Sequence, residues 1–191
     1  MKKNNFNGSS REYLQNLVDL VSHTNYNDLD NAINLIYKAW QDGKQIITFG
    51  NGGSALTALH FITDWNKSIF MSTGKPFRGR SLIDNIGLIT AYGNDIKYED
   101  IFVQQLMNCM NPGDLVIAIS GSGNSPNIIK AINFANENNA VTLGLCGFSG
   151  GELKNIAQNI VWANINDMQL SEDFHAIFGH IVMKNLCSFN N

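Results

Sequence analysis

The sequence predicts an α/β fold in which helices cover both faces of a parallel sheet. Residues 45–49 and 115–119 form short apolar runs with the length of buried strands, and each run leads through a Gly- or Ser-rich turn into a helical pattern. Helical and strand-like segments alternate along the chain, as is typical of parallel sheets with helical crossovers. With 191 residues and no low-complexity linker, we expect one domain, 1–191.

Two helices are expected before the first strand. Apolar residues recur at helical spacing from Leu14 to Val21 and again from Leu29 to Trp40. Gly43 then ends the second helix, because glycine readily adopts the left-handed backbone conformation found after helix ends. We therefore separate residues 1–43, the N-terminal helices, from residues 44–191, the sheet core and C-terminal helix.

The remaining elements follow from periodicity and turn residues. In order, we expect a helix over 55–65, a surface loop over 67–80, a strand at 81–83, a helix over 86–92 ended by Gly93, a turn with Asn94 and Asp95, a helix over 98–110, the strand at 115–119, a helix over 127–136, a strand at 141–145, a short helix to 157, a strand at 160–162 and a closing helix over 169–186.

Composition excludes several classes of function. The net charge is −3 and the only basic cluster is Lys2–Lys3, which argues against a nucleic-acid groove or a membrane-surface patch. Cys109, Cys146 and Cys187 lack metal-ligand or redox spacing, so we expect reduced thiols. No run of eighteen apolar residues and no apolar leader segment occurs in the sequence. We therefore expect a cytoplasmic protein.

Two polar turns at strand ends are the strongest functional signal. Gly50-Asn51-Gly52-Gly53-Ser54 and the segment from Ser120 to Ser125 each follow a strand and open a helix. Glycines let a ligand approach the backbone, and the start of a helix favours an anion such as phosphate. A single such turn is equally an ordinary tight connection, but the repeat favours phosphate binding. Neither turn is a P-loop, because no Gly-Lys-Ser/Thr follows.

Two helices carry groups suited to metal binding or proton transfer. His60 and Asp64 are four residues apart and share one helix face, as half of a metal or acid–base site or as a surface pair. The closing helix carries Glu172, His175 and His180. Glu172 and His180 could line one groove, or the polar side chains of this helix could form a rim around a packed apolar face.

These motifs together resemble the SIS (sugar isomerase) domain family and, within it, the bacterial phosphoheptose isomerases, which act on sedoheptulose 7-phosphate. The similarity covers nearly the whole chain. It consists of Gly-Asn-Gly-Gly-Ser from residue 50 with His60 and an acid at 64, Asn94-Asp95, Ser-x-Ser-Gly-Asn-Ser from residue 120, and Glu-Asp-x-His-x4-His from residue 172.

The resemblance implies a flavodoxin-like five-stranded parallel sheet, a homotetramer assembled in part through the N-terminal helices, and active sites between subunits. It implies substrate binding by Asn51, Gly52, Gly53, Asn94, Asp95, Ser120, Gly121, Ser122 and Ser125. It implies one zinc ion per site on His60, Asp64, Glu172 and His180, and catalysis by Asp64, His180 and Glu172. The expected activity is aldose–ketose isomerisation of a heptose 7-phosphate through an enediol, for surface polysaccharide synthesis.

Three positions depart from the pattern of the family. Position 64 is usually Glu and here is Asp, position 172 is usually Gln and here is Glu, and position 121 is usually Thr and here is Gly. The shorter Asp64 must be brought within hydrogen-bond reach of its target. These changes leave open whether zinc is required. Two alternatives to an isomerase therefore remain: a non-catalytic SIS module that binds a protein partner, such as a replication initiator, and a sensor of sugar phosphates.

Overall fold

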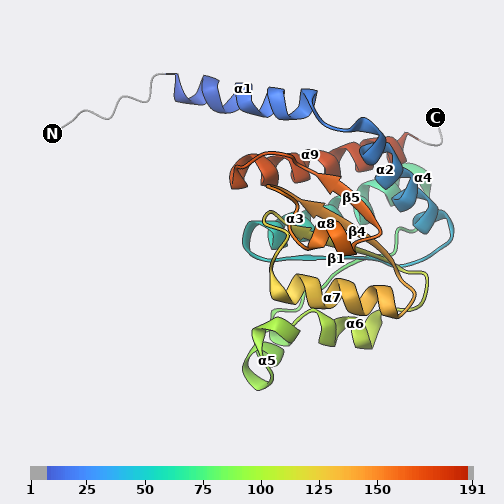
Figure 1. Ribbon diagram of the computed structural model, residues 1–191. Coiled ribbons are helices and arrows are strands. Elements are labelled where there is room, and N and C mark those ends of the chain that lie inside the picture. The colour runs from blue at the N-terminus through green and yellow to red at the C-terminus, as the bar shows by residue number, and fades with distance from the viewer. Residues whose placement is uncertain (1–7, 189–191) are drawn as a thin grey trace.

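Five strands form one parallel sheet in the computed structural model, which describes residues 8–188 (Figure 1). The strands lie in the order β2-β1-β3-β4-β5, which is the flavodoxin-like order predicted above. Lys2, Lys3 and the ends of the expected domain lie outside the described residues. The strands are β1 Ile46–Gly50, β2 Gly79–Ser81, β3 Leu115–Ser120, β4 Val141–Cys146 and β5 Asn159–Trp162.

Helices cover both faces of this sheet (Figure 1). One layer contains α1 Ser9–Ser22, α2 Tyr26–Gln41, α3 Gly52–Asp64, a π-helical turn Trp65–Ile69, α4 Phe70–Thr73 and α9 Met168–Cys187. The other contains α5 Ile86–Asp95, a 3₁₀ turn Tyr98–Asp100, α6 Val103–Cys109, α7 Pro126–Glu137 and α8 Leu153–Ile156. None of the helices within residues 8–188 has the length and apolar character needed to cross a membrane. All three cysteines are free, as expected.

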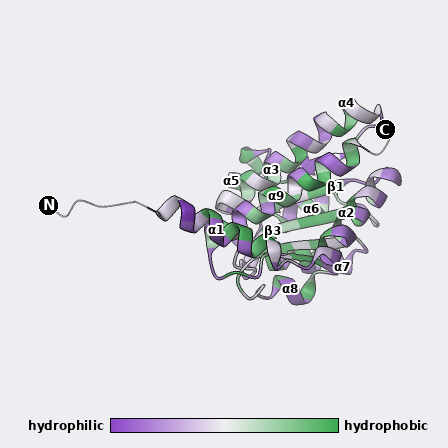
Figure 2. Ribbon diagram, turned by 90° about the horizontal axis from the view of Figure 1, so that it is seen from above, coloured by the Kyte–Doolittle hydropathy of each residue, from purple (hydrophilic) through white to green (hydrophobic). Residues whose placement is uncertain are grey.

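Both faces of the sheet are buried, because alternate residues of each strand enter different cores. In β3, Leu115 and Ile117 pack in the core beneath α2, α3 and α9. Val116 and Ala118 pack in the core beneath α6, α7 and α8. The strands in the interior are coloured mainly as hydrophobic in Figure 2, whereas the surrounding helices carry both colours. Burial on two sides explains why the strands are continuous apolar runs in the sequence.

The segment after α3 differs from the surface loop expected over residues 67–80. α3 passes through the π-helical turn into α4, and the helix ends only at Gly74, which has a φ of 70°. Trp65 and Ile69 are fully buried in this stretch. Their packing keeps the backbone helical where the sequence shows no clear periodicity.

Three further boundaries were predicted wrongly. β2 begins two residues early, at Gly79, where its backbone pairs with β1. α5 continues through Gly93 to Asp95 instead of ending at the glycine. The helix expected over residues 98–110 is divided into the 3₁₀ turn and α6. At this division the buried Asp100 forms an ion pair with Lys130 of α7, a tertiary contact that the sequence does not mark.

α1 extends away from the body of the molecule (Figure 1). Leu20 is its one buried residue, while Leu14 and Val18, four residues apart on one face, are 59% and 55% exposed. The Tyr13 hydroxyl donates a 2.7 Å hydrogen bond to the Asp173 carboxylate of α9, which raises the pKa of Tyr13 to about 12. α1 is therefore anchored on α9 and leaves an apolar strip exposed.

α3 and α9 pack against each other at a glycine. The indole N–H of Trp65, directly after α3, donates to the carbonyl oxygen of Gly179 at 3.0 Å. The ring of Phe61 stacks on Trp65 with centroids 4.8 Å apart and occupies the space that a side chain at Gly179 would need. The absence of a Cβ at this position therefore permits the close approach of the two helices.

Gly179→Ala should destabilise the protein, because the added methyl group meets the Phe61 ring and overpacking of this kind costs about 1–3 kcal/mol. Gly93→Ala is the matched control. It also replaces a helical glycine, but its Cβ would lie 3.8 Å from Ile101, at ordinary contact distance. The control should leave the free energy of unfolding unchanged or raise it by up to about 1 kcal/mol, since alanine is the better helix former. Urea denaturation measures both free energies of unfolding, and equal values would contradict the role given to Gly179.

Candidate functional site

A cavity of about 280 Å³ lies at the carboxyl ends of β1 and β3, where the strand order reverses. Ligands bind to open parallel sheets at this position, because the loops of two neighbouring strands diverge there. Seven of the predicted substrate-binding residues line the cavity together: Asn51, Gly52, Gly53, Ser120, Gly121, Ser122 and Ser125. The other lining residues are Glu172 and three that were not predicted to bind substrate: Ser54, which belongs to the first polar turn, Ile119 and Met168.

Two helices begin at this cavity. α3 starts at Gly52, whose φ of 54° favours glycine, and α7 starts at Pro126. The start of a helix carries a partial positive charge and N–H groups without intrahelical partners, which together favour an anion such as phosphate. The residues lining the cavity include no Lys or Arg. An anion bound here would therefore be held by N–H groups and serine hydroxyls.

The loop from residue 120 to residue 125 is held in shape by its own side chains. The N–H of Gly123 donates to the Ser120 hydroxyl at 3.2 Å, and the N–H of Asn124 donates to the Ser122 hydroxyl at 3.3 Å. A side chain at Gly121 would meet the sulfur of Met168. Glycine in place of the expected threonine therefore suits a cavity wall that Met168 already fills. No side-chain pattern in the sequence marks Met168 for this position.

His60, Asp64 and His180 form a cluster where α3 and α9 adjoin. The Nε2 atom of His60 lies 3.2 Å from Asp64 Oδ2, and the Nε2 atom of His180 lies 3.7 Å from the same oxygen. One potential ligand atom from each residue lies within 4.8 Å of the others. The two imidazole side chains are 48% and 51% exposed, so a ligand can reach them. Two imidazoles and a carboxylate at this spacing are a suitable donor set for zinc.

Glu172 does not belong to this cluster of three. Its carboxylate lies against Gly53 at the start of α3, where a Cβ on the glycine would be 2.5 Å from Glu172 Oε1. Glu172 and His180 are eight residues apart on α9, which corresponds to a rise of about 12 Å. Within one chain, the four predicted metal ligands are therefore divided into a cluster of three and a separate carboxylate in the cavity.

Asn94 and Asp95 are not among the residues that line the cavity. They form the exposed last turn of α5, and the Asn94 amide donates to the Asp95 carboxylate at 2.8 Å. The structure of one chain therefore does not bring this predicted pair to the other substrate-binding residues.

His175 is fully buried, although its place between Glu172 and His180 suggested a polar rim. Its Nε2 donates to the carbonyl oxygen of Cys146 at the end of β4, at 3.2 Å, and its Nδ1 has no hydrogen-bond partner within residues 8–188. Burial lowers the pKa of His175 to about 4, so the ring is neutral near pH 7. This histidine therefore supports the end of a strand and lies apart from the histidine cluster.

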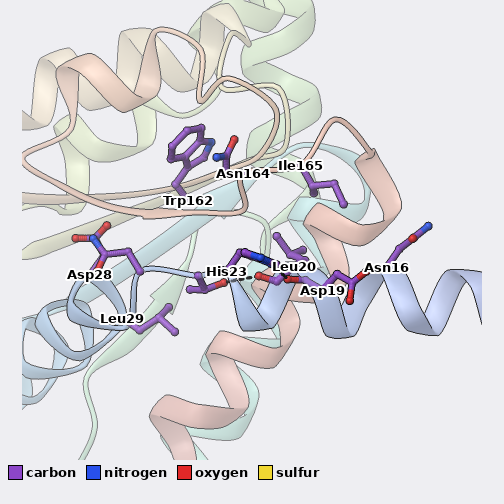
Figure 3. A pocket seen from close by; sticks show the side chains of 11 residues that line it. Asn16, Asp19, Leu20, His23, Asp28, Leu29, Trp162, Asn164 and Ile165 are labelled. Carbon is purple, nitrogen blue, oxygen red and sulfur yellow. Dashed lines mark hydrogen bonds between the residues drawn. The ribbon is translucent and has the colours of Figure 1, made fainter.

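A separate cavity of about 370 Å³ lies between the α1–α2 connection and the end of β5 (Figure 3). Asp19, His23 and Asp28 are among its lining residues. The His23 ring donates from Nδ1 to the carbonyl oxygen of Asp19 at 2.7 Å. None of the predicted site residues lines this cavity, and we assign no chemistry to it.

Comparison with known proteins identifies the family of this chain. A family model described as SIS domain matches residues 11–147. The chain is 32% identical over 173 residues to a protein of Thermoplasma acidophilum named probable phosphoheptose isomerase, with 91% of this chain and 94% of that protein covered. It is 30% identical over 174 residues to the phosphoheptose isomerase of Aliarcobacter butzleri, with coverage of 90% and 92%.

Solved structures agree with the observed fold. A phosphoheptose isomerase from Francisella tularensis superposes with a TM-score of 0.87 at 22% identity, covering 95% of each chain. One from Neisseria gonorrhoeae has a TM-score of 0.87 at 21% identity, covering 95% of this chain and 98% of that one. Fold and cavity define an α/β protein whose site suits a phosphorylated ligand. With the family model matched over most of its length, the chain belongs to the SIS domain family.

Proposed function

We propose that this protein is an aldose–ketose isomerase that converts sedoheptulose 7-phosphate into D-glycero-D-manno-heptose 7-phosphate, for the synthesis of surface polysaccharides. The observation that carries the proposal is the cavity at the ends of β1 and β3, which is lined by seven of the nine residues expected to bind the sugar phosphate. Relatives that align with about nine-tenths of the chain are named phosphoheptose isomerases. A phosphorylated substrate also favours a cytoplasmic location.

The phosphate binds to the loop from Ser120 to Ser125 in this proposal. The hydroxyls of Ser122 and Ser125 and the first N–H groups of α7 hold its oxygens, while the start of α3 contacts the sugar phosphate from the other side. The carboxylate of Glu172 would repel the phosphate, so it faces the sugar hydroxyls. Binding of the remote phosphate then positions the carbons that react.

Isomerisation moves hydrogen between neighbouring carbons through a cis-enediol. A base removes a proton from C1 of the ketose, the C–H electron pair forms the C1–C2 double bond, and the C2 oxygen takes up a proton. Protonation of C2 and loss of the C1 hydroxyl proton then give the aldose. We assign the base and acid to Asp64 and His180, whose side chains lie 3.7 Å apart. Glu172, which shares the cavity with the sugar, is the third proposed acid–base group.

We assign one zinc ion to the donor set of His60, Asp64 and His180. Catalytic zinc sites combine three protein ligands with an open fourth position, and these three side chains fit that description. Zinc bound there would polarise a substrate oxygen as a Lewis acid in place of His180, which would then serve as a ligand, and would leave one oxygen of Asp64 free to act as the base. His60 also lies 3.2 Å from Asp64 and can hold its carboxylate in place. Glu172, the fourth predicted ligand, would join this set only from a second copy of the chain.

The proposed activity predicts that purified protein converts sedoheptulose 7-phosphate into the aldose. His180→Ala should abolish turnover, because the acid–base pair loses one member. Replacing both Ser122 and Ser125 by Ala should raise KM far more than it lowers stability, since both hydroxyls proposed to hold the phosphate are removed, whereas the fold loses only the loop hydrogen bond from Asn124 N to Ser122. Ser22→Ala on α1 is the control and should behave as the wild type. Wild-type protein that binds the ketose without turnover would be a sensor, and near-normal turnover by His180→Ala would exclude its catalytic role.

The proposed zinc site predicts that activity is lost on chelation and restored by added zinc. One zinc ion per chain should be found by elemental analysis of the restored protein, and His60→Ala should lower that content because it removes one of three donors. His23→Ala is a matched control, since this histidine lies at the end of α1 and outside the cluster of His60, Asp64 and His180. Full activity after chelation would show that the isomerase works without metal.

We also propose a homotetramer with active sites shared between subunits. Gly53 lines the cavity and His60 belongs to the histidine cluster, and the seven residues between these positions correspond to a rise of about 10 Å along α3. One chain therefore holds two separate parts of a site. Two helices have apolar faces with little cover: α5 has no buried residue, with Ile86 75% exposed, and α1 exposes Leu14 and Val18. Contact between copies would cover these faces and could join cavity and cluster.

The tetramer predicts a molar mass of four chains in multi-angle light scattering. Leu14→Asp combined with Val18→Asp should lower that mass, because charges on the α1 strip oppose its burial, while leaving the fold intact. Lys38→Asp on the exposed face of α2 is a control for added negative charge. A stable wild-type monomer at micromolar concentration would refute both the tetramer and the shared site.

A further inference from the structure

Two asparagine side chains join the two loops of the cavity. The Asn51 amide donates to Asn127 Oδ1 at 2.9 Å, and the Asn127 amide donates back to Asn51 Oδ1 at 3.0 Å. Asn51 follows β1, and Asn127 is the second residue of α7, which begins directly after the loop from Ser120 to Ser125. The Asn127 side chain is 2% exposed, so its amide depends on this partner for hydrogen bonds.

A third side chain holds the same amide. The Tyr98 hydroxyl, from the 3₁₀ turn, donates to Asn51 Oδ1 at 2.9 Å. The oxygen of Asn51 therefore accepts two hydrogen bonds, from Tyr98 and Asn127, and both of its lone pairs are occupied. The side chain of Asn51 is thus fixed between α7 and the 3₁₀ turn.

This arrangement is unusual for an asparagine at the start of a helix. Asn51 is the N-cap residue of α3, and N-cap side chains commonly accept a hydrogen bond from the second or third N–H of their helix. Asn25, Asn85 and Asp167 do so at the starts of α2, α5 and α9, at 3.1, 3.2 and 2.9 Å. Asn51 makes no such bond.

This position of the Asn51 side chain affects the first N–H groups of α3, which belong to residues that line the cavity. The first hydrogen bond of α3 runs from Ala55 N to the carbonyl oxygen of Asn51 at 3.2 Å. The N–H groups of Gly53 and Ser54 precede it and are the ones that an N-cap side chain would engage. With the Asn51 side chain turned away, these groups stay available to a ligand.

We propose that Asn127 and Tyr98 are positioning residues, which hold the Asn51 side chain off the start of α3 so that its N–H groups bind the sugar phosphate. The inference rests on the proposed function and refines it, because it makes the backbone at Gly53 and Ser54, and not the Asn51 amide, the binding group on this side. When Asn127 is removed, Asn51 is free to cap α3 and compete with the substrate.

The first test compares two variants with the wild type by titration calorimetry, using sedoheptulose 7-phosphate and inorganic phosphate as ligands. Asn127→Ala should weaken binding of the sugar phosphate about tenfold, in the range of one charge-assisted hydrogen bond. Adding Asn51→Ala to Asn127→Ala should recover most of that loss, because the competing cap is gone. A double variant that binds as weakly as Asn127→Ala, or more weakly, would overturn the inference and indicate that the Asn51 amide itself contacts the ligand.

Tyr98→Phe provides a second route, because it removes one hydroxyl from a side chain that is 57% exposed and should fold normally. It should weaken binding about twofold to threefold through partial release of Asn51, and Asn51→Ala should again reverse the loss. If Asn127→Ala does not fold, the inference is tested by comparing Tyr98→Phe with and without Asn51→Ala. No change in affinity in either variant would overturn the inference.

Asn25→Ala is the matched control, since it deletes an asparagine N-cap that does bond to its own helix. It should lower the melting temperature and leave the affinity for both probes unchanged. Wild-type protein that binds neither probe would overturn the proposed function and this inference together. Wild-type protein that binds and isomerises the sugar phosphate, with variants that bind equally well, would overturn this inference alone.

Discussion

The close packing of α3 against α9 is the contact on which both parts of the site depend. The helices adjoin at Gly179, whose missing side chain admits the Phe61 ring. Near the first turns of both helices, Glu172 of α9 lies against Gly53 of α3 and contributes a carboxylate to the cavity. Further along, His60 and His180 meet with ring centroids 5.0 Å apart and an interplanar angle of 78°. One interface thus supplies a carboxylate to the cavity and brings together His60, Asp64 and His180.

The residues that line the cavity include no basic side chain, so the proposed phosphate would be bound by N–H groups and hydroxyls. The partial charge of a helix terminus acts only within the first turn, so a phosphate has to approach the backbone closely. Small residues at the starts of α3 and α7 make this approach possible, and serine hydroxyls complete the set of donors. Such a site tolerates Glu172, whose carboxylate lies against Gly53, only if the phosphate itself lies toward α7 and the sugar hydroxyls face the carboxylate.

The departures from the family pattern have structural counterparts. Gly121 lies beside Met168, whose sulfur takes the place of a larger side chain. Asp64 is one methylene shorter than the usual glutamate, yet its Oδ2 is within 3.2 and 3.7 Å of two imidazole nitrogens. It is the last residue of α3, and the π-helical turn follows at once. Such turns inside helices are frequent at functional sites.

The sequence by itself determined the parallel sheet, the two polar turns at strand ends and the pairing of His60 with Asp64. These features are local: strands buried on both faces are apolar runs, and residues four apart on a helix share a face. The same reasoning could not recognise the helical stretch after Asp64 or the partner of Asn51, because burial of Trp65 and the bonds to Asn127 come from distant segments.

Only the tertiary structure decided which residues of α9 face which neighbour. Helical spacing allowed Glu172 and His180 to line one groove, but the fold places Glu172 in the cavity and His180 beside Asp64, with His175 between them in the core. The period of a helix defines the faces of that helix alone. What each face meets, and at what height, depends on the helix or sheet packed against it, here on how far α9 runs along α3.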